Sequence, residues 1–306
     1  MSVAVTRTET GTRPELAALE VNPPLGYIGS QLLPIMKVQA KAGTYYYSTL
    51  VADADAQTSR TPGVAPTAVT LAESAETFAM DERIKRYKLP WEMIPLIGGL
   101  DKSDERGAKA AKRSVMNALE TAQLDAVISA AGTSITGGII DGVINALDSV
   151  SRYSGRTAFV ANVGAYRWLI QQDEIKNPLL RTFGGAGMTE IMAIQPQVIK
   201  AMFQAIFQVD EVLIGNDHFW PYAYRSTAAI VKIPDGTDEM SFVSEPEYGR
   251  TMIYWPTGSS PYEINSFADD DLRSNIFDCA EWDSIEEMNS GAKVLLTLDT
   301  VGTTTD

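Results

Sequence analysis

Two side chains in this 306-residue sequence have the chemistry of a catalytic pair: the single histidine, His218, and the single cysteine, Cys279. A thiol beside an imidazole can act as a nucleophile activated by a base. His218 lies in GNDHFWPY, a turn flanked by aromatic residues, and has no second histidine or nearby cysteine to complete a metal site. The two residues would meet only by accident of folding. We therefore predict no catalytic residue and no metal site here.

Three other segments have residue types that can bind ligands. FGGAG at 183–187 lacks the lysine of a phosphate loop and the strand-to-helix setting of a dinucleotide fingerprint, which favours a plain loop. Asp269, Asp270 and Asp271 could bind a divalent cation, but consecutive residues point in different directions, which favours a solvated acidic turn. Asp53 and Asp55 have the same interpretation. We predict no cofactor-binding residue, no cofactor and no enzymatic activity.

Composition indicates a globular chain of one large or two modest domains. Hydrophobic residues make up 45% of the sequence, enough for a sizeable core, and no apolar run approaches the roughly 18 residues of a membrane span. The start, MSVAVTRTETGTRPE, has no apolar stretch typical of a secretory signal. We expect an intracellular protein, at least when it is made, with no membrane association. The lone cysteine excludes an internal disulfide.

Charge is distributed unevenly along the chain, whose formal net charge is −14. From Asp235 onward there are sixteen acidic residues against Arg250, Arg273 and Lys293, whereas the stretch 81–113 has nine basic and six acidic residues. An acidic chain is a poor candidate for wrapping nucleic acid, because affinity for phosphates comes chiefly from Lys and Arg. The basic and acidic stretches could meet between copies of the chain, or could simply be a solvated helix face and an acidic tail region.

The N-terminal third predicts an arm followed by a long hairpin. Residues 1–36 are punctuated by prolines and glycines and have no clean periodicity. Lys37–Leu50 reads as a strand with Tyr45, Tyr46 and Tyr47, and Glu76–Leu89 as the returning strand. Between them lies a stretch rich in Ala, Thr, Asp, Ser and Pro. An isolated two-stranded hairpin is marginal in water, so this one needs a partner surface from outside its own domain.

After Pro90 the pattern changes to a long helix and then to alternating helices and strands. Apolar and Ala residues recur at helical spacing up to about 130–132, which predicts a helix of about 28 residues and about 42 Å. It could be a spine across a flat domain or an ordinary long core helix. From Ile139 we expect helices and short strands in turn, an extended region from Glu263, and a final strand at Lys293–Leu298.

This order of parts resembles the major capsid proteins of tailed bacteriophages, which have the HK97-like fold, and the likeness covers nearly the whole chain. The segment RTAFVANVGAYRWLI, in which a predicted strand is followed by Asn and then a helix, has the same local pattern as these proteins. The resemblance implies an α+β fold whose parts are, in order, an N-arm (1–36), an E-loop hairpin (37–90), a P-domain with a spine helix (91–135), an A-domain (136–255), and a C-terminal return to the P-domain with a final strand (256–306).

The resemblance also implies a function. Copies of the chain would form hexamers and pentamers and close into an icosahedral shell, the phage head, around double-stranded DNA that is enclosed without sequence-specific binding. Because the chain has no long N-terminal pro-segment, scaffolding would come from a separate protein, and portal and decoration proteins would be further partners. We expect assembly in the host cytoplasm and a final location in the virion. The intersubunit contacts would begin at the root of the hairpin, where the predicted contact residues are Tyr45, Tyr46, Tyr47, Arg83, Lys85, Arg86 and Lys88.

Two alternatives stay open at this point. An encapsulin nanocompartment is a shell of the same fold that encloses cargo enzymes. A soluble α/β enzyme or carbohydrate-binding protein, with the hairpin as a dimerisation arm, predicts a small particle and a pocket with convergent polar groups.

Overall fold

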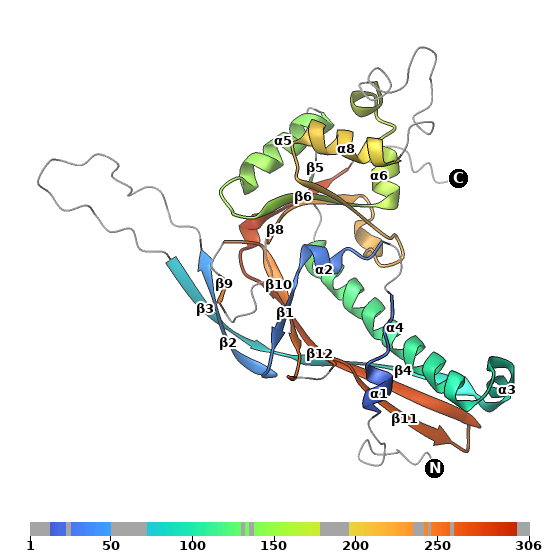
Figure 1. Cartoon of the computed structure of the whole chain (residues 1–306). Helices are drawn as coiled ribbons and strands as arrows, with labels where there is room; N and C mark the ends of the chain where they lie inside the picture. The colour runs from blue at the N-terminus through green and yellow to red at the C-terminus, as the bar shows by residue number, and fades with distance from the viewer. Residues whose placement is uncertain are drawn as a thin grey trace, which may run out of the picture.

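The computed structural model describes residues 13–22, 26–49, 72–129, 132–134, 138–177, 196–234, 242–243, 246–257 and 260–298. These residues form three sheets and one helix far longer than the others. The body has two parts: an elongated lower part built on the first sheet, and an upper part in which helices cover the second sheet (Figure 1). The third sheet extends sideways from their junction (Figure 1).

The first sheet carries the long helix. Strand β12 (Ser274–Glu287) pairs along one edge first with β11 (Glu263–Asp269) and then with β10 (Gly249–Tyr254), and along its other edge with β4 (Asp81–Pro90). Strand β1 (Ile35–Val38) pairs with the outer edge of β10. Helix α4, Leu100–Val127, has 28 residues, as the periodicity predicts, and lies along this sheet (Figure 1). It ends a few residues earlier than expected.

Small residues let α4 lie close to the sheet. Ala108, Ala111 and Val115 are fully buried against a cluster that includes Phe277. A Cβ added at Gly107 would lie 2.2 Å from Cε2 of Phe277, so only glycine permits this approach. The Ala-rich stripe in the sequence therefore marks the surface on which the sheet packs.

The second sheet has the order β5 (Thr133–Ser134), β13 (Lys293–Thr297), β8 (Thr227–Ile233), β6 (Arg156–Asn162) and β7 (Glu211–Gly215). Helices α5 (Ile139–Val150), α6 (Val163–Leu169) and α8 (Pro196–Phe207) pack on one face, and α2 (Gly29–Leu32) and the end of α4 pack near the other (Figure 1). Asn162 starts α6, because its side chain accepts a hydrogen bond from the Ala165 N–H at 2.6 Å.

The third sheet contains the hairpin. Strand β2 (Ala42–Thr49) pairs antiparallel with β3 (Ala72–Ala79) and parallel with β9 (Phe242–Val243). The two predicted hairpin strands are each divided: β1 ends at Val38 before β2 starts, and the returning strand begins earlier than expected and is broken at Met80 into β3 and β4. Because of these breaks, the returning segment contributes β3 to the third sheet and β4 to the first. The connection at 51–71 lies outside the described residues.

In the C-terminal half of the chain, the strands of each sheet come from more than one of the predicted domain ranges. Strand β10 falls within 136–255 but belongs to the first sheet, and β13 falls within 256–306 but belongs to the second. The chain thus enters the upper part after α4, returns to the lower part through β10, β11 and β12, and ends in the upper part. The domain ranges stay a prediction. The short elements α1 (Pro14–Ala17), η3 (Trp91–Met93), α3 (Ile94–Ile97), η5 (Tyr222–Tyr224) and η6 (Ser290–Ala292) complete the fold.

Candidate functional site

The residues considered for catalysis lie apart. His218 is exposed, and its ring contacts Phe219 edge-to-face with centroids 5.0 Å apart. Cys279 is fully buried under α4, and burial raises the pKa of its thiol to about 12. A thiol with such a pKa is not a nucleophile at neutral pH. The two belong to different sides of the fold, and among the described residues no group of His, Cys, Asp and Glu has metal-binding geometry.

Asp269 behaves as the acidic-turn interpretation predicts. Its Oδ1 accepts a hydrogen bond from the Leu272 N–H at 3.0 Å in the turn that joins β11 to β12, and Asp270 and Asp271 are exposed. FGGAG at 183–187, Asp53 and Asp55 lie outside the described residues. No helix in the described part of the chain is long and apolar enough to cross a membrane.

The three tyrosines at the root of the hairpin alternate between the two faces of β2. Tyr45 and Tyr47 are buried and stack with ring centroids 5.8 Å apart. Their hydroxyls donate to the two carboxylate oxygens of Glu76 at 2.9 and 3.0 Å. Burial raises the pKa of both phenols. Tyr46 points the other way and is 48% exposed. An intersubunit role stays a prediction, and of the three rings only that of Tyr46 presents a large surface to a neighbour.

The basic run on β4 meets the acidic C-terminal stretch within the same chain. Arg83 donates two hydrogen bonds to Asp283, at 2.9 and 2.8 Å, and Arg86 donates two to Asp278, at 2.6 and 2.7 Å. Such bidentate pairs are the strong form of this contact. The β4–β12 pairing brings these basic and acidic residues together within one chain, and a role for Arg83 and Arg86 in contacts between copies stays a prediction. Lys85 and Lys88 are exposed.

The N-terminal arm is tied to α4 by two buried charged residues. Glu120, only 2% exposed, accepts hydrogen bonds from the backbone N–H groups of Ile28, at 2.8 Å, and Gly29, at 3.0 Å. Lys112 donates to the carbonyl oxygens of Leu19, at 2.8 Å, and Ala17, at 3.3 Å. Sequence reasoning did not single out either residue. The only indication in the sequence was that each of them is a charged residue near the apolar stripe of a long helix.

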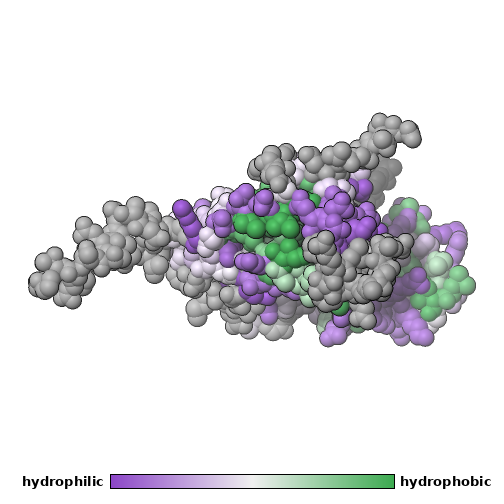
Figure 2. Space-filling view, turned by 90° about the horizontal axis from the view of Figure 1, so that it is seen from above, coloured by the Kyte–Doolittle hydropathy of each residue, from purple (hydrophilic) through white to green (hydrophobic). Residues whose placement is uncertain are grey.

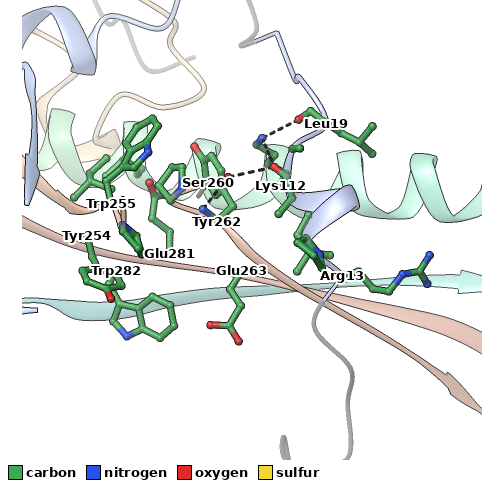
Figure 3. A pocket seen from close by; sticks show the side chains of 18 of the residues that line it. Arg13, Leu19, Lys112, Tyr254, Trp255, Ser260, Tyr262, Glu263, Glu281 and Trp282 are labelled. Atoms are coloured by element: carbon green, nitrogen blue, oxygen red, sulfur yellow. Dashed lines mark hydrogen bonds between the residues drawn. The ribbon is translucent and has the colours of Figure 1, made fainter. Parts of the chain in front are cut away.

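A cavity of about 970 Å³ lies between the arm, α4 and the first sheet, and Figure 3 shows the side chains around it. It is lined by aromatic residues and by charged residues from the arm, α4 and β12. They include Arg13, Lys112, Tyr254, Trp255, Tyr262, Glu281 and Trp282.

A second feature without an assigned role is an apolar end of the molecule. Trp91, Met93, Leu96 and Leu100 are exposed where η3, α3 and α4 begin, and Leu272 is exposed in the β11–β12 turn. Figure 2 shows hydrophobic residues gathered at this end, opposite the hairpin. Exposed apolar residues grouped in this way are typical of interaction surfaces.

Solved structures identify the fold. The chain matches no protein-family model and no curated protein. It is similar to a phage-related protein from Bordetella bronchiseptica RB50, with 14% identity, coverage of 94% of this chain and 97% of that one, and a TM-score of 0.63. The mature capsid of bacteriophage PhiM1 is similar at 12% identity, 93% and 90% coverage and a TM-score of 0.54.

The encapsulin complex holo-SrpI from Synechococcus elongatus PCC 7942 has the same fold, at 9% identity, 93% coverage of both chains and a TM-score of 0.56. The matches span nearly the whole chain. The chain therefore has the HK97-like capsid fold, as the order of its elements predicts.

Proposed function

We propose that this chain is the major capsid protein of a tailed bacteriophage. Copies of it assemble as hexamers and pentamers into an icosahedral head that encloses double-stranded DNA. The observation that carries the proposal is the HK97-like architecture along almost the full length of the chain, which it shares with the mature capsid of bacteriophage PhiM1. The role is structural, not enzymatic, and the protein's location is the virion after assembly in the host cytoplasm.

The shape of the described chain supports self-association. The β2–β3 hairpin projects from the body (Figure 1), and the apolar packing of its described residues belongs to one cluster, which includes Tyr45, Tyr47 and Phe78. A projecting hairpin gains stability when it lies on a neighbouring subunit. Tyr46, Lys85, Arg86 and Lys88 are the predicted contact residues with exposed side chains that a neighbour can reach.

An acidic chain also suits this role. A shell wall that bound phosphate tightly would hinder the packing and release of DNA. Scaffolding, portal and decoration proteins are the partners that such a shell uses, and we propose a separate scaffolding protein for this one.

Electron microscopy of the purified protein, alone and with its scaffolding partner, tests the proposal. We expect closed shells of uniform size. A chain that stays a monomer or dimer under all assembly conditions would contradict the proposal. Deleting Asp53–Glu73 should leave the subunit folded and block stable shell formation, and a wild-type yield of shells from that variant would remove the hairpin from the mechanism.

A cargo-enclosing compartment is the second candidate, because an encapsulin matches the fold as closely as the phage capsids do. The contents of nuclease-treated particles separate the two. Protected double-stranded DNA supports the phage head, and a co-purified enzyme without DNA supports the compartment.

A further inference from the structure

The outer edge of β11 is open along most of its length among the described residues. Strand β11 pairs with β12 on one edge and is the last strand of the first sheet. On the other edge, the backbone N–H of Arg13 donates to the Ile264 carbonyl at 2.9 Å. Because alternate residues of a strand direct both backbone groups to the same side, Ser266 and Ala268 present theirs to this edge as well. No described backbone group bonds to either of them there.

The N-terminal arm runs antiparallel to this edge. Arg13 is bonded to Ile264, and further along the arm the Ala17 carbonyl accepts a hydrogen bond from Oγ of Ser260, which precedes β11. Helix α1 lies beside β11 in agreement with these contacts (Figure 1). As residue numbers in the arm fall, those of their neighbours on β11 therefore rise. Continued from Arg13 toward the N-terminus, the chain would meet the open backbone groups of β11 one after another.

The side chain of Arg13 shows which face of the sheet the arm follows. Its Nη1 donates to Oγ of Ser266 at 3.4 Å and lies 3.6 Å from Oδ2 of Asp104 on α4. Arg13 therefore points to the face that α4 covers, where Ile264 is buried. Side chains two residues apart share a face of a strand. The odd-numbered residues before Arg13 would then face α4, and the even-numbered residues would face away from it.

The sequence before Arg13 has the pattern of such an edge strand. Residues 1–36 as a whole have no clean periodicity, but threonine occupies every second position of TRTETGTR, at 6, 8, 10 and 12. Strict alternation of a β-branched residue is typical of a strand with one uniform face. In register with Arg13, the threonines would face away from α4. Gly11 would lie opposite Ser266, where the Arg13 guanidinium needs the space that a larger side chain would fill.

Charge favours the same register. If residue 13 lies opposite residue 264, residue 7 lies opposite residue 270. Arg7 would then reach the turn between β11 and β12, where Asp270 and Asp271 are exposed. An arginine at this point offsets the repulsion between neighbouring carboxylates and holds the far end of the segment.

We propose that the outer edge of β11 is a strand-docking site whose occupant is the segment Thr6–Thr12 of the same chain. The segment adds antiparallel to β11, with Gly11 and Glu9 exchanging backbone hydrogen bonds with Ser266 and Ala268. Its tether is already bonded to the edge, which raises the effective concentration of the segment there. An open strand edge is a template for pairing with other chains, and the docked segment closes it. The site is complete in one chain, so the inference does not depend on the proposed shell.

Amide hydrogen exchange of the full chain, resolved by residue with mass spectrometry, tests the pairing. We expect the amides of Ser266 and Ala268 to exchange at least about 10-fold more slowly in the wild type than in Glu9→Pro. Proline at position 9 removes an N–H that bonds to β11, and its ring does not fit against the edge. The matched control is Thr10→Pro, because the N–H at position 10 points away from β11. This variant should exchange as the wild type does.

A disulfide cross-link identifies the occupant. Thr10→Cys and Phe267→Cys, introduced together, place two cysteines directly opposite in this register, within the Cα separation that a disulfide needs. We expect oxidation to join them within one chain, which gives a faster band on a denaturing, non-reducing gel. Glu9→Cys with Phe267→Cys is the matched control and should not form the bond, because the two side chains lie on opposite faces. The native Cys279 is buried and does not compete.

Four results would overturn the proposal. Equal exchange of the two β11 amides in the wild type and Glu9→Pro would show that the segment does not pair there. The same loss of protection in Thr10→Pro would show that the register is wrong. A cross-linked dimer in place of the intrachain disulfide would assign the edge to a second copy of the chain. No cross-link from Thr10→Cys with Phe267→Cys would exclude the segment as the occupant.

Discussion

Two buried glutamates lie beneath the same N-terminal arm, and their surroundings differ in one respect. Glu120 on α4 is 2% exposed and accepts hydrogen bonds from two backbone N–H groups of the arm. Glu281 on β12 is fully buried and has no hydrogen-bond donor among the described residues. Burial raises the pKa of both, but only at Glu120 do hydrogen bonds oppose it.

The difference separates a buried acid that holds two segments together from one whose burial no hydrogen bond offsets. A buried carboxylate whose lone pairs are used holds two segments together, and its removal leaves buried donors unsatisfied. A buried carboxylate without donors costs stability, and such local violations are expected at sites that serve function. The comparison therefore predicts opposite effects of removing the two charges.

The largest effect should follow the loss of the Glu120 carboxylate. Glu120→Leu leaves the N–H groups of Ile28 and Gly29 buried without acceptors, and we expect the free energy of unfolding to fall by about 4 kcal/mol. Urea denaturation followed by circular dichroism measures it. Glu105→Leu, on the exposed side of the same helix, is the matched control. A loss below about 1 kcal/mol would mean that the arm is held by apolar contacts alone.

The second effect is a pH dependence that Glu281 alone should produce. Because its folded-state pKa, about 8, lies above its unfolded value, the folded state binds an extra proton, and stability falls as pH rises toward 8. We expect the wild type to lose about 3 kcal/mol between about pH 5 and pH 8 relative to Glu281→Gln. Parallel pH profiles of the two proteins would show that Glu281 is already compensated.

A third prediction creates a second unpartnered acid beside the first. Asp283 is 3% exposed, and Arg83 is its bidentate partner, so Arg83→Met should cost about 2 kcal/mol. Arg86→Met is the matched change three positions further along β4, on a more exposed pair, and should cost less than about 1 kcal/mol. Equal losses from the two variants would show that burial of the acid does not set the cost.

The smallest effect should come from Lys112. Lys112→Met removes two hydrogen bonds to the arm and also a desolvated ammonium, so we expect a net loss of about 1 kcal/mol. The pKa of Glu281 should then rise further, which shifts the midpoint of the pH profile upward. Lys109→Met is the exposed control on the same helix. An unchanged midpoint would show that Lys112 does not affect Glu281.

Periodicity predicted the elements of this fold well because each is defined by local residues. The length of α4, the strand–Asn–helix unit at β6 and α6, and the final strand β13 follow from spacing and capping. The extended region predicted from Glu263 is divided into two strands, β11 and β12. The breaks in the hairpin strands did not follow. Met80 divides the returning strand because β3 and β4 pair with different partners, and those partners are distant in sequence.

The site could be predicted only in part. The sequence indicated Arg83 and Arg86 by their charge, but it could not show that Asp283 and Asp278 on the neighbouring strand β12 accept their hydrogen bonds. It marked Tyr45, Tyr46 and Tyr47 as a group, whereas the pleat buries two and exposes one. Glu281 was one acid among the sixteen of the C-terminal stretch, with nothing local to distinguish it.

The sequence by itself determined the order of parts, the long Ala-faced helix, the need of the hairpin for a partner surface and the absence of a recognisable catalytic motif. These follow from propensity, periodicity and composition, which act over a few residues. Tertiary structure alone decided which charges pair within the chain and where the first sheet divides. That division depends on the register of three strands, which pair residues distant in sequence, so no local pattern encodes it.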